Sequence, residues 1–70
     1  MTEKGFVKTV GERIKRRRTS AGISAATLAM RLGITQGTQY NRERGQPFSI
    51  AELPRYCKLL KCGLKDLLPQ

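Results

Sequence analysis

The sequence predicts an all-α domain of five short helices, and two features of the chain support this fold class. The chain has 70 residues, enough for one domain with a small hydrophobic core. Hydrophobic residues make up 39% of it, as in a globular protein, and they recur at helical spacing between capping residues and glycines. A core of this size is only marginally sufficient for folding alone, so a partner subunit would stabilise it.

The N-terminal segment differs in pattern from the rest of the chain. Residues 1–8 carry no helical periodicity and are assigned to an N-terminal arm, whereas residues 9–69 are assigned to the helical domain. Thr9 and Glu12 have the spacing of a capping box. This predicts a helix over residues 10–21, followed by a glycine suited to the left-handed conformation.

A basic run lies within this first predicted helix. Residues 13–18 (RIKRRR) contain five cations in six positions. Such a run is typical of a solvated helix face, but it also suits a surface that contacts phosphates or pairs with other residues. The sequence alone leaves both interpretations open.

The next two predicted helices form the stretch around which the rest of the chain is organised. Ser24 is the expected N-cap of a helix that ends at Gly33, and Thr35 is the expected N-cap of a helix over residues 36–44. The second helix contains no Leu, Ile, Val or Met, so it adds little to a core. Two helices across a tight glycine turn, with a hydrophilic second helix, are typical of a helix-turn-helix.

The C-terminal part of the chain predicts two more helices. Ser49 and Glu52 form a second capping box, which predicts a helix over residues 50–60. Pro54 falls just past its first turn, so the helix should begin as a looser turn or bend there. A last short helix over residues 64–68 is rich in leucine and should cover the core, form a dimer contact, or do both. The apolar stripe predicted for the longer helix is Ile50, Leu53, Tyr56, Cys57 and Leu60.

The charge of the chain limits its partners. A formal net charge of +9, with an isoelectric point near 10.4, favours a polyanionic partner, of which nucleic acid is the commonest. A membrane surface is the competing polyanion. No apolar run approaches the length of a spanning helix, however, and no signal peptide opens the chain.

Catalysis and metal binding lack candidate residues. The chain has no histidine, and its two cysteines, Cys57 and Cys62, cannot form a zinc site by themselves. They are interpreted as small buried thiols in a reducing compartment. The five carboxylates show no spacing typical of acid–base catalysis, and no cysteine or serine lies beside a plausible base. We therefore expect no enzyme, no bound metal and no cofactor.

A series of short motifs in register carries a family resemblance. From residue 10 onward the chain resembles the Cro/cI-type helix-turn-helix domain of the Xre family of phage and bacterial repressors. Its C-terminal tail is similar to that of the lambdoid phage repressors. The resemblance implies the five-helix fold of a lambda-repressor-like DNA-binding domain. The motifs are GERI (11–14), Arg18, GIS (22–24), LA (28–29), LGIT (32–35), ERG (43–45) and LKDLL (64–68).

The resemblance also implies which residues contact DNA. Base reading is expected at Gln36, Gly37, Tyr40 and Asn41, and also at Gln39 if the helix is rotated. Contacts to the DNA backbone are expected at Ser24, Ala25, Thr35, Thr38, Arg42 and Arg44, and at Arg17 on the first helix. Arg18 and Glu43 match a buried ion pair that links the first predicted helix to the third.

Four positions depart from the family pattern, and one of them is Arg17, which stands where leucine is common. The family usually has a glutamine that steadies a phosphate where this chain has Ala25. It prefers an aliphatic residue at the position of Gln39, and an aromatic or aliphatic residue at that of Arg42. Gln39 therefore either faces the core and finds a hydrogen-bond partner, or reads a base from a rotated helix. Tyr40 could turn inward to replace the missing aromatic ring.

The function expected from these observations is that of a sequence-specific DNA-binding transcription regulator. We expect a repressor that binds a pseudo-palindromic operator in double-stranded DNA as a homodimer. The dimer contact is expected from the last helix and the C-terminal tail, unless the chain is the N-terminal part of a longer repressor. The alternative is a helical protein–protein interaction module that has lost operator reading, an interpretation favoured by Ala25, Gln39 and Arg42.

The expected setting follows from the same class of protein. We expect a cytoplasmic, nucleoid-associated protein of bacterial, phage or plasmid origin. Its partner would be double-stranded DNA, with neither a membrane nor a small-molecule substrate. The operator sequence does not follow from the chain.

Overall fold

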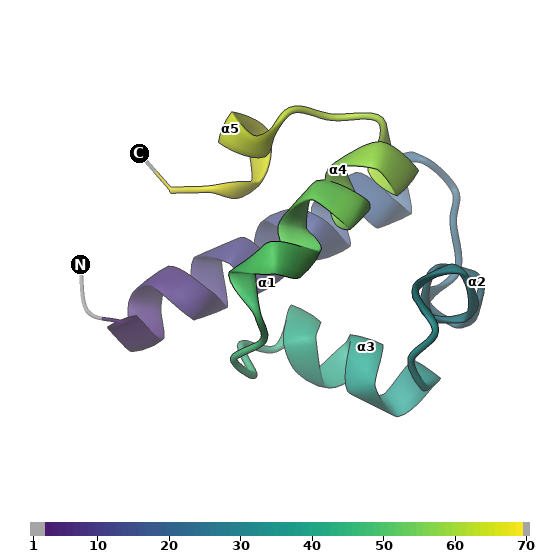
Figure 1. Cartoon of the computed structure of the whole chain (residues 1–70), viewed down its shortest axis with the longest axis horizontal. Coiled ribbons are helices and arrows are strands. Elements are labelled where there is room, and N and C mark those ends of the chain that lie inside the picture. Colours follow the sequence, from purple (N-terminus) through teal and green to yellow (C-terminus); the bar gives the residue numbers. More distant parts are fainter. Residues whose placement is uncertain (1–2, 70) are drawn as a thin grey trace.

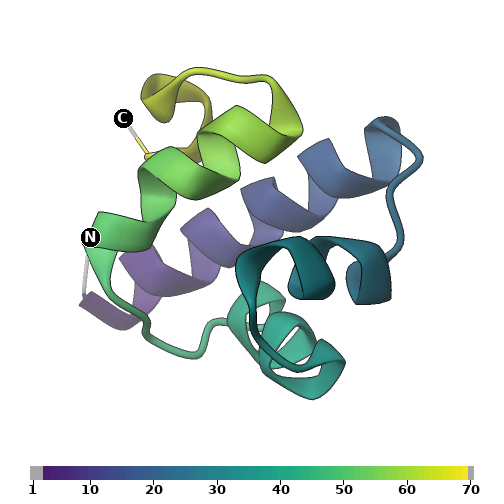
Figure 2. The same ribbon diagram turned by 45° about the vertical axis from the view of Figure 1, so that its right-hand side comes forward.

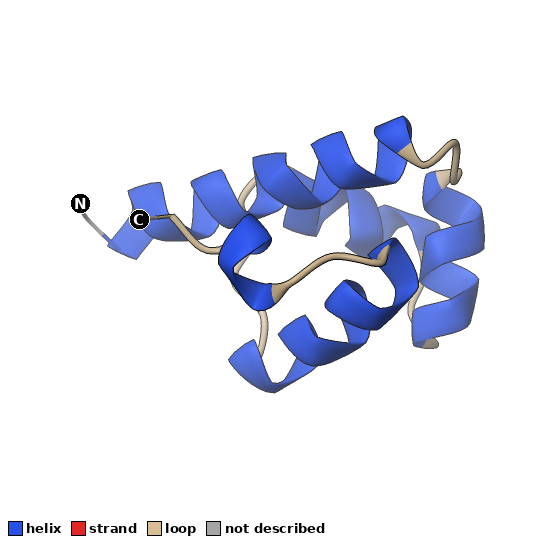
Figure 3. Ribbon diagram, turned by 90° about the horizontal axis from the view of Figure 1, so that it is seen from above, coloured by secondary structure: helices blue, strands red, loops and turns tan. Residues whose placement is uncertain are grey.

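The structure is a computed structural model that describes residues 3–69, and within this range it contains helices and no strands (Figures 1 and 3). The predicted all-α fold with five α-helices is confirmed. None of the described helices is long and apolar enough to cross a membrane. The elements are α1 (Glu3–Ser20), α2 (Ala25–Leu32), α3 (Gln36–Glu43), the 3-10 turn η1 (Ile50–Glu52), α4 (Leu53–Leu60) and α5 (Leu64–Leu67).

α1 is the central element of the fold. Figure 2 shows α2 and α3 on one side of α1, and α4 and α5 on the other. One hydrophobic core joins both sides, and every α-helix except α3 contributes to it. The buried core residues are Val10, Ile14, Leu28, Leu32, Leu53, Tyr56, Leu60 and Leu67. As predicted, α3 adds no large aliphatic side chain to this core.

The ends of α2 and the start of α3 lie where the local sequence predicts them. Ser24 Oγ accepts a hydrogen bond from the backbone N–H of Thr27 at 3.0 Å, and Thr35 Oγ1 accepts one from Thr38 at 3.1 Å. α2 ends at Gly33, whose φ of 74° lies in the left-handed region. Each cap satisfies a backbone group that the helix leaves unpaired, so nearby residues are enough to define these ends.

The start of α1 corrects the prediction of an N-terminal arm. α1 begins at Glu3 and not at residue 10, so Thr9 and Glu12 lie inside the helix and form no capping box. Residues 3–8 are therefore the first turns of α1. The remaining two residues of the predicted arm, 1–2, lie outside the described residues.

Apolar contacts explain why these first turns are helical. Phe6 and Val7 line a small apolar hollow with Phe48 and Leu53, which lie far along the chain. A short helical segment is marginal by itself in water, and packing of its apolar face supplies the missing stability. The partner residues are distant in sequence, so the local pattern of residues 1–8 did not reveal this helix.

The start of α4 follows one of the two predicted alternatives. Ser49 caps the 3-10 turn η1, and its Oγ accepts a hydrogen bond from the Ala51 N–H at 3.3 Å. α4 begins only at Leu53, with Pro54 in its first turn, where a missing N–H leaves no intrahelical bond unmade. The looser first turn is thus confirmed. Ile50, predicted to lie in the apolar stripe, is 69% exposed because it belongs to η1 and not to α4.

The two cysteines are free and partly buried. The backbone N–H of Cys62 donates to the Cys57 carbonyl oxygen at 3.0 Å, which helps to close the end of α4. Burial raises the pKa of the Cys62 thiol above its ordinary value. This thiol is therefore protonated at neutral pH.

α1 and α3 approach each other most closely at Gly11. A Cβ added to Gly11 would lie 2.9 Å from the carbonyl oxygen of Glu43 and closer still to that of Arg42. Both oxygens belong to the backbone of the last turn of α3, which cannot move aside independently. A side chain at this position would force the two helices apart.

Candidate functional site

The exposed face of α3 is polar along its whole length. Its members recur at helical spacing and end one residue beyond the helix: Gln36, Gly37, Tyr40, Asn41 and Arg44. We call this set the polar face. It contains no carboxylate, and it offers amide donors and acceptors, a phenol hydroxyl and a guanidinium. Such groups suit the edges of bases and the oxygens of phosphates.

Hydrogen bonds along the helix orient the side chains of the polar face. Gln36 Nε2 donates to the Tyr40 hydroxyl oxygen at 3.4 Å, and the Arg44 guanidinium donates to Asn41 Oδ1. Tyr40 is 42% exposed, so its ring does not take the alternative position turned inward toward the core. Gly37 has open space where a Cβ would stand, which lets a partner approach the helix backbone closely.

A buried hydrogen-bonded network fixes the opposite face of α3. Arg18 of α1 donates to the Glu43 carboxylate through Nε at 2.7 Å and through Nη2 at 3.1 Å. Gln39 Nε2 donates to Glu43 Oε2 at 2.8 Å, and the Tyr56 hydroxyl of α4 donates to Gln39 Oε1 at 2.6 Å. The network joins three helices. Among the described residues, no buried side-chain nitrogen or oxygen lacks a hydrogen-bond partner.

This network decides between the two interpretations of Gln39. The side chain is 0% exposed, so it faces the core and the predicted base contact of Gln39 is wrong. Tyr56 supplies the hydrogen-bond partner that the buried Gln39 amide needs. An aliphatic residue at position 39 would need no such partner. Burial raises the pKa of the Tyr56 phenol above its ordinary value, so the hydroxyl stays protonated and can donate.

The ion pair between Arg18 and Glu43 forms as predicted. Arg18 is only 8% exposed, and the two side chains lie between α1 and α3. The hydrogen bond to the Glu43 carboxylate raises the pKa of Arg18 above its already high ordinary value. Arg18 is therefore charged at neutral pH, and the Glu43 carboxylate compensates this charge.

Tyr56→Phe is expected to lower the free energy of unfolding by about 1–3 kcal/mol, because Gln39 Oε1 loses its donor in a buried site. Replacing both partners, as in Tyr56→Phe with Gln39→Leu, should recover part of that loss. Urea unfolding of the two variants measures this difference. Tyr40→Phe is the matched control, since loss of an exposed hydroxyl should change the free energy of unfolding by less than about 0.5 kcal/mol. Equal losses for the two tyrosines would contradict the network.

Two arginines predicted to contact the DNA backbone are directed elsewhere. Arg42 donates to Glu52 Oε1 at 2.8 Å, and its guanidinium carbon lies 4.8 Å from the centre of the Phe48 ring. Arg17 pairs with Asp66, next to α5, with 3.2 Å between Nη2 and Oδ1. Neither side chain joins the polar face. The structure therefore corrects the prediction for Arg42, whose side chain is only 11% exposed and is bonded within the fold. The Arg17 side chain is 45% exposed in its pair, so its contact with the DNA backbone stays a prediction.

Apart from Arg44, which directly follows the last residue of α3, the remaining predicted backbone contacts lie at the starts of α2 and α3. Ser24 and Thr35 are exposed N-caps, and Thr38 is half-buried and bonded to Thr35, with 2.8 Å between the two hydroxyl oxygens. Helix N-termini of this kind suit anions. Ala25 is only 2% exposed, so it offers almost no surface for the contact with the DNA backbone that was predicted at this position.

Two residues of this region were missed by sequence reasoning. Tyr56 was assigned to the apolar stripe alone, and Gly11 was treated only as part of a motif. A tyrosine inside an apolar stripe is a usable signal, because a buried hydroxyl needs a partner. No local signal marks Gly11, since the backbone that it approaches belongs to α3.

The fold and the polar face together define a helical domain in which α2 and α3 form a helix-turn-helix. This is the arrangement by which many proteins place a second helix in the major groove of DNA. The model of the helix-turn-helix domain family matches residues 9–68, and the chain belongs to this family. The family predicted from the motifs is thus confirmed.

Relatives of the chain include one curated protein and several solved structures. A protein of Pyrobaculum aerophilum, provisionally named an HTH-type transcriptional regulatory protein, is 47% identical over 45 residues, which cover 60% of this chain and 18% of that protein. Hydroxypropylphosphonic acid epoxidase from S. wedmorenis is 28% identical with a TM-score of 0.87, over 94% of this chain and 36% of the epoxidase. The restriction-modification controller protein C.AhdI from Aeromonas hydrophila is 25% identical with a TM-score of 0.79, over 89% of this chain and 96% of the controller.

The chain spans very different fractions of the length of these relatives. The chain spans 18% of the length of the Pyrobaculum protein and 36% of the epoxidase. It spans 96% of the controller protein. The helix-turn-helix domain is therefore found both within longer proteins and as nearly the whole of a short one.

Proposed function

We propose that this chain is a sequence-specific DNA-binding transcription regulator that acts as a repressor. The observation that carries the proposal is the division of α3 into two faces. Its polar face is free of carboxylates, and its other face is anchored by the network of Arg18, Glu43, Gln39 and Tyr56. A helix held in this way presents rigid donors and acceptors to the major groove.

The overall charge and the relatives support the same function. The net charge of +9 attracts a polyanion at long range. The Pyrobaculum protein is named a transcriptional regulatory protein, and C.AhdI is named a controller protein of a restriction-modification system. By this proposal the chain acts by binding and not by catalysis, although the epoxidase carries a similar domain.

The proposed assembly is a homodimer on a pseudo-palindromic operator. Two copies of α3 would enter successive major grooves roughly 34 Å apart. The dimer contact is assigned to α5 and the residues after it. Leu64, on α5, supports this assignment because it is 46% exposed despite being a large apolar side chain.

The alternative, a protein–protein interaction module, rested on three departures from the family pattern. Two of them now have roles in the fold, since Gln39 bonds Tyr56 and Arg42 bonds Glu52. The third, Ala25, is an ordinary buried residue. The departures therefore no longer favour the interaction module over the regulator.

Selection of duplexes from a random pool tests the proposed function. The selected duplex and a random duplex are then compared by fluorescence anisotropy at several salt concentrations. We expect a steep loss of affinity with salt for both, and a preference for the selected duplex of on the order of a thousandfold or more. The selected sequences also give the half-site, its spacing and its symmetry. Equal, weak affinity for every duplex would refute the proposal.

Gln36→Ala is expected to relax base preference at one operator position and to lower the binding free energy for the preferred base there by on the order of 1–3 kcal/mol. Gln36 opens the polar face, and a glutamine amide can bond adenine in the major groove. Arg44→Ala is the contrasting variant, because loss of a phosphate contact should weaken all sequences about equally. Repeating the selection with each variant measures both effects. An unchanged preference profile for Gln36→Ala would mean that α3 lies differently in the groove.

A further inference from the structure

An open, basic hollow adjoins the polar face where α3 ends. Its volume is about 270 Å³, and it lies between the first turns of α1 and the chain just after α3. Lys8 and Arg44 line it, together with Gly5 and Gly45. Two cations from separate elements thus border one concave surface whose remaining lining residues have no side chain.

Gly45 brings the chain just after α3 against the backbone of α1 at Lys8. Its φ of 109° is a conformation that residues with a side chain rarely adopt, and a Cβ added to it would lie 3.3 Å from Lys8 Cα. The turn after α3 therefore rests directly on the backbone of α1. Because Lys8 lies within a continuous helix, its position relative to Arg44 is fixed by this contact.

Neither cation is neutralised within the described part of the chain. Arg44 donates to the neutral amide of Asn41, and no side chain that the structure describes forms a hydrogen bond or ion pair with the exposed Lys8 side chain. Among the described side chains, three carboxylates form ion pairs, and all three lie elsewhere: Glu43 with Arg18, Glu52 with Arg42, and Asp66 with Arg17. Glu12, one turn beyond Lys8 on α1, is exposed and forms none. The hollow is therefore a concave site of positive charge, which suits an anion.

We propose that this hollow binds a phosphate of the DNA backbone, with Lys8 and Arg44 contacting it from two sides. The inference rests on the proposed function, because Arg44 also belongs to the polar face and the hollow continues that face. It extends the DNA contact beyond the helix-turn-helix to the first turns of α1. The contact is to a phosphodiester, so it adds affinity without adding sequence preference.

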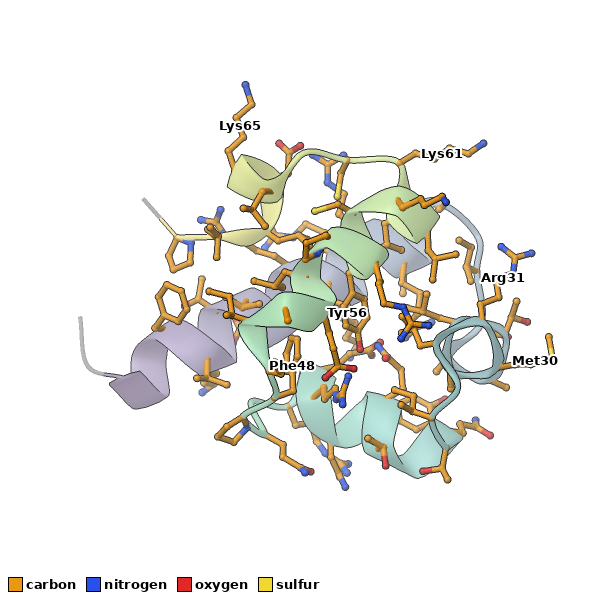
Figure 4. All side chains as sticks on the ribbon, in the orientation of Figure 1. Met30, Arg31, Phe48, Tyr56, Lys61 and Lys65 are labelled. Atoms are coloured by element: carbon orange, nitrogen blue, oxygen red, sulfur yellow. The ribbon has the colours of Figure 1, made fainter. Side chains whose placement is uncertain are left out.

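The test compares Lys8→Gln with Lys61→Gln in the full chain. Both variants remove one positive charge, but Lys61 points away from the side that carries α3 (Figure 4). Lys8→Gln should weaken binding to the selected and the random duplex by the same factor. It should also reduce the slope of log affinity against log salt by about 0.9, the value for one phosphate. Lys61→Gln should leave this slope unchanged, and both variants should melt at the temperature of the original protein.

Lys8→Gln combined with Arg44→Gln tests whether the two residues share one phosphate. If they do, the loss of affinity in the double variant is smaller than the product of the two single losses. Equal slopes for Lys8→Gln and Lys61→Gln would overturn the inference, as would a change in sequence preference caused by Lys8→Gln. The proposed function survives either result as long as the original protein prefers its selected duplex. It fails separately if that preference is absent.

Discussion

Gly11→Ala is expected to lower the free energy of unfolding by roughly 3 kcal/mol or more, at or beyond the upper end of ordinary overpacking. The new Cβ would overlap the carbonyl oxygen of Arg42 and crowd that of Glu43, and both are backbone atoms. Relief requires α1 and α3 to separate, which would also stretch the buried Arg18–Glu43 pair. Urea unfolding followed by circular dichroism measures the change.

Gly37→Ala is the matched control for this substitution. Gly37 lies in α3 with open space around it, so alanine there should raise the free energy of unfolding by up to about 1 kcal/mol through helix propensity. The two glycine variants are thus expected to shift stability in opposite directions. A shift of the same sign and size in both would show that α1 and α3 do not meet at Gly11.

Glu43→Ala is expected to lower the free energy of unfolding by about 3–5 kcal/mol, because it leaves the Arg18 charge buried without a partner. Gln39 loses a hydrogen bond at the same time. Small domains have unfolding free energies of only about 5–15 kcal/mol, so this variant should lose a large share of its stability and melt at a much lower temperature. Thermal and urea unfolding measure the loss.

An exposed glutamate provides the comparison for this variant. Glu12→Ala changes the net charge by the same amount on the surface of α1, and it should alter stability by no more than about 0.5 kcal/mol. The contrast separates the buried pair from a general effect of charge. Similar melting temperatures for the two variants would contradict a buried role for Glu43.

The parts of the fold that the sequence predicted are those defined by nearby residues. The N-caps Ser24 and Thr35 each bond a backbone N–H three residues away, and Gly33 ends α2 by its own conformation. The start of α1 was missed because the apolar residues beside it, such as Phe48, which lines the same hollow as Phe6, lie about forty positions further along the chain.

The same distinction holds within the candidate site. Gln36, Tyr40 and Asn41 are exposed as predicted, since helical periodicity alone separates them from the core. Gln39 and Arg42 were misassigned because their partners, Tyr56 and Glu52, lie on other elements. Polar residues stand at positions that would suit apolar side chains, and the structure shows that Gln39 forms buried hydrogen bonds and Arg42 a part-buried one.

The two faces of α3 have a consequence for how this chain can change over generations. Anchoring belongs to Gln39 and Glu43, whereas the proposed reading of bases belongs to Gln36 and Asn41, and the two pairs share no hydrogen bond. Substitution at exposed positions of this kind changes the free energy of unfolding by no more than about 0.5 kcal/mol, far less than the loss caused by breaking the buried pair. New operator preferences can therefore arise by drift on one side of the helix while the other side keeps the scaffold intact.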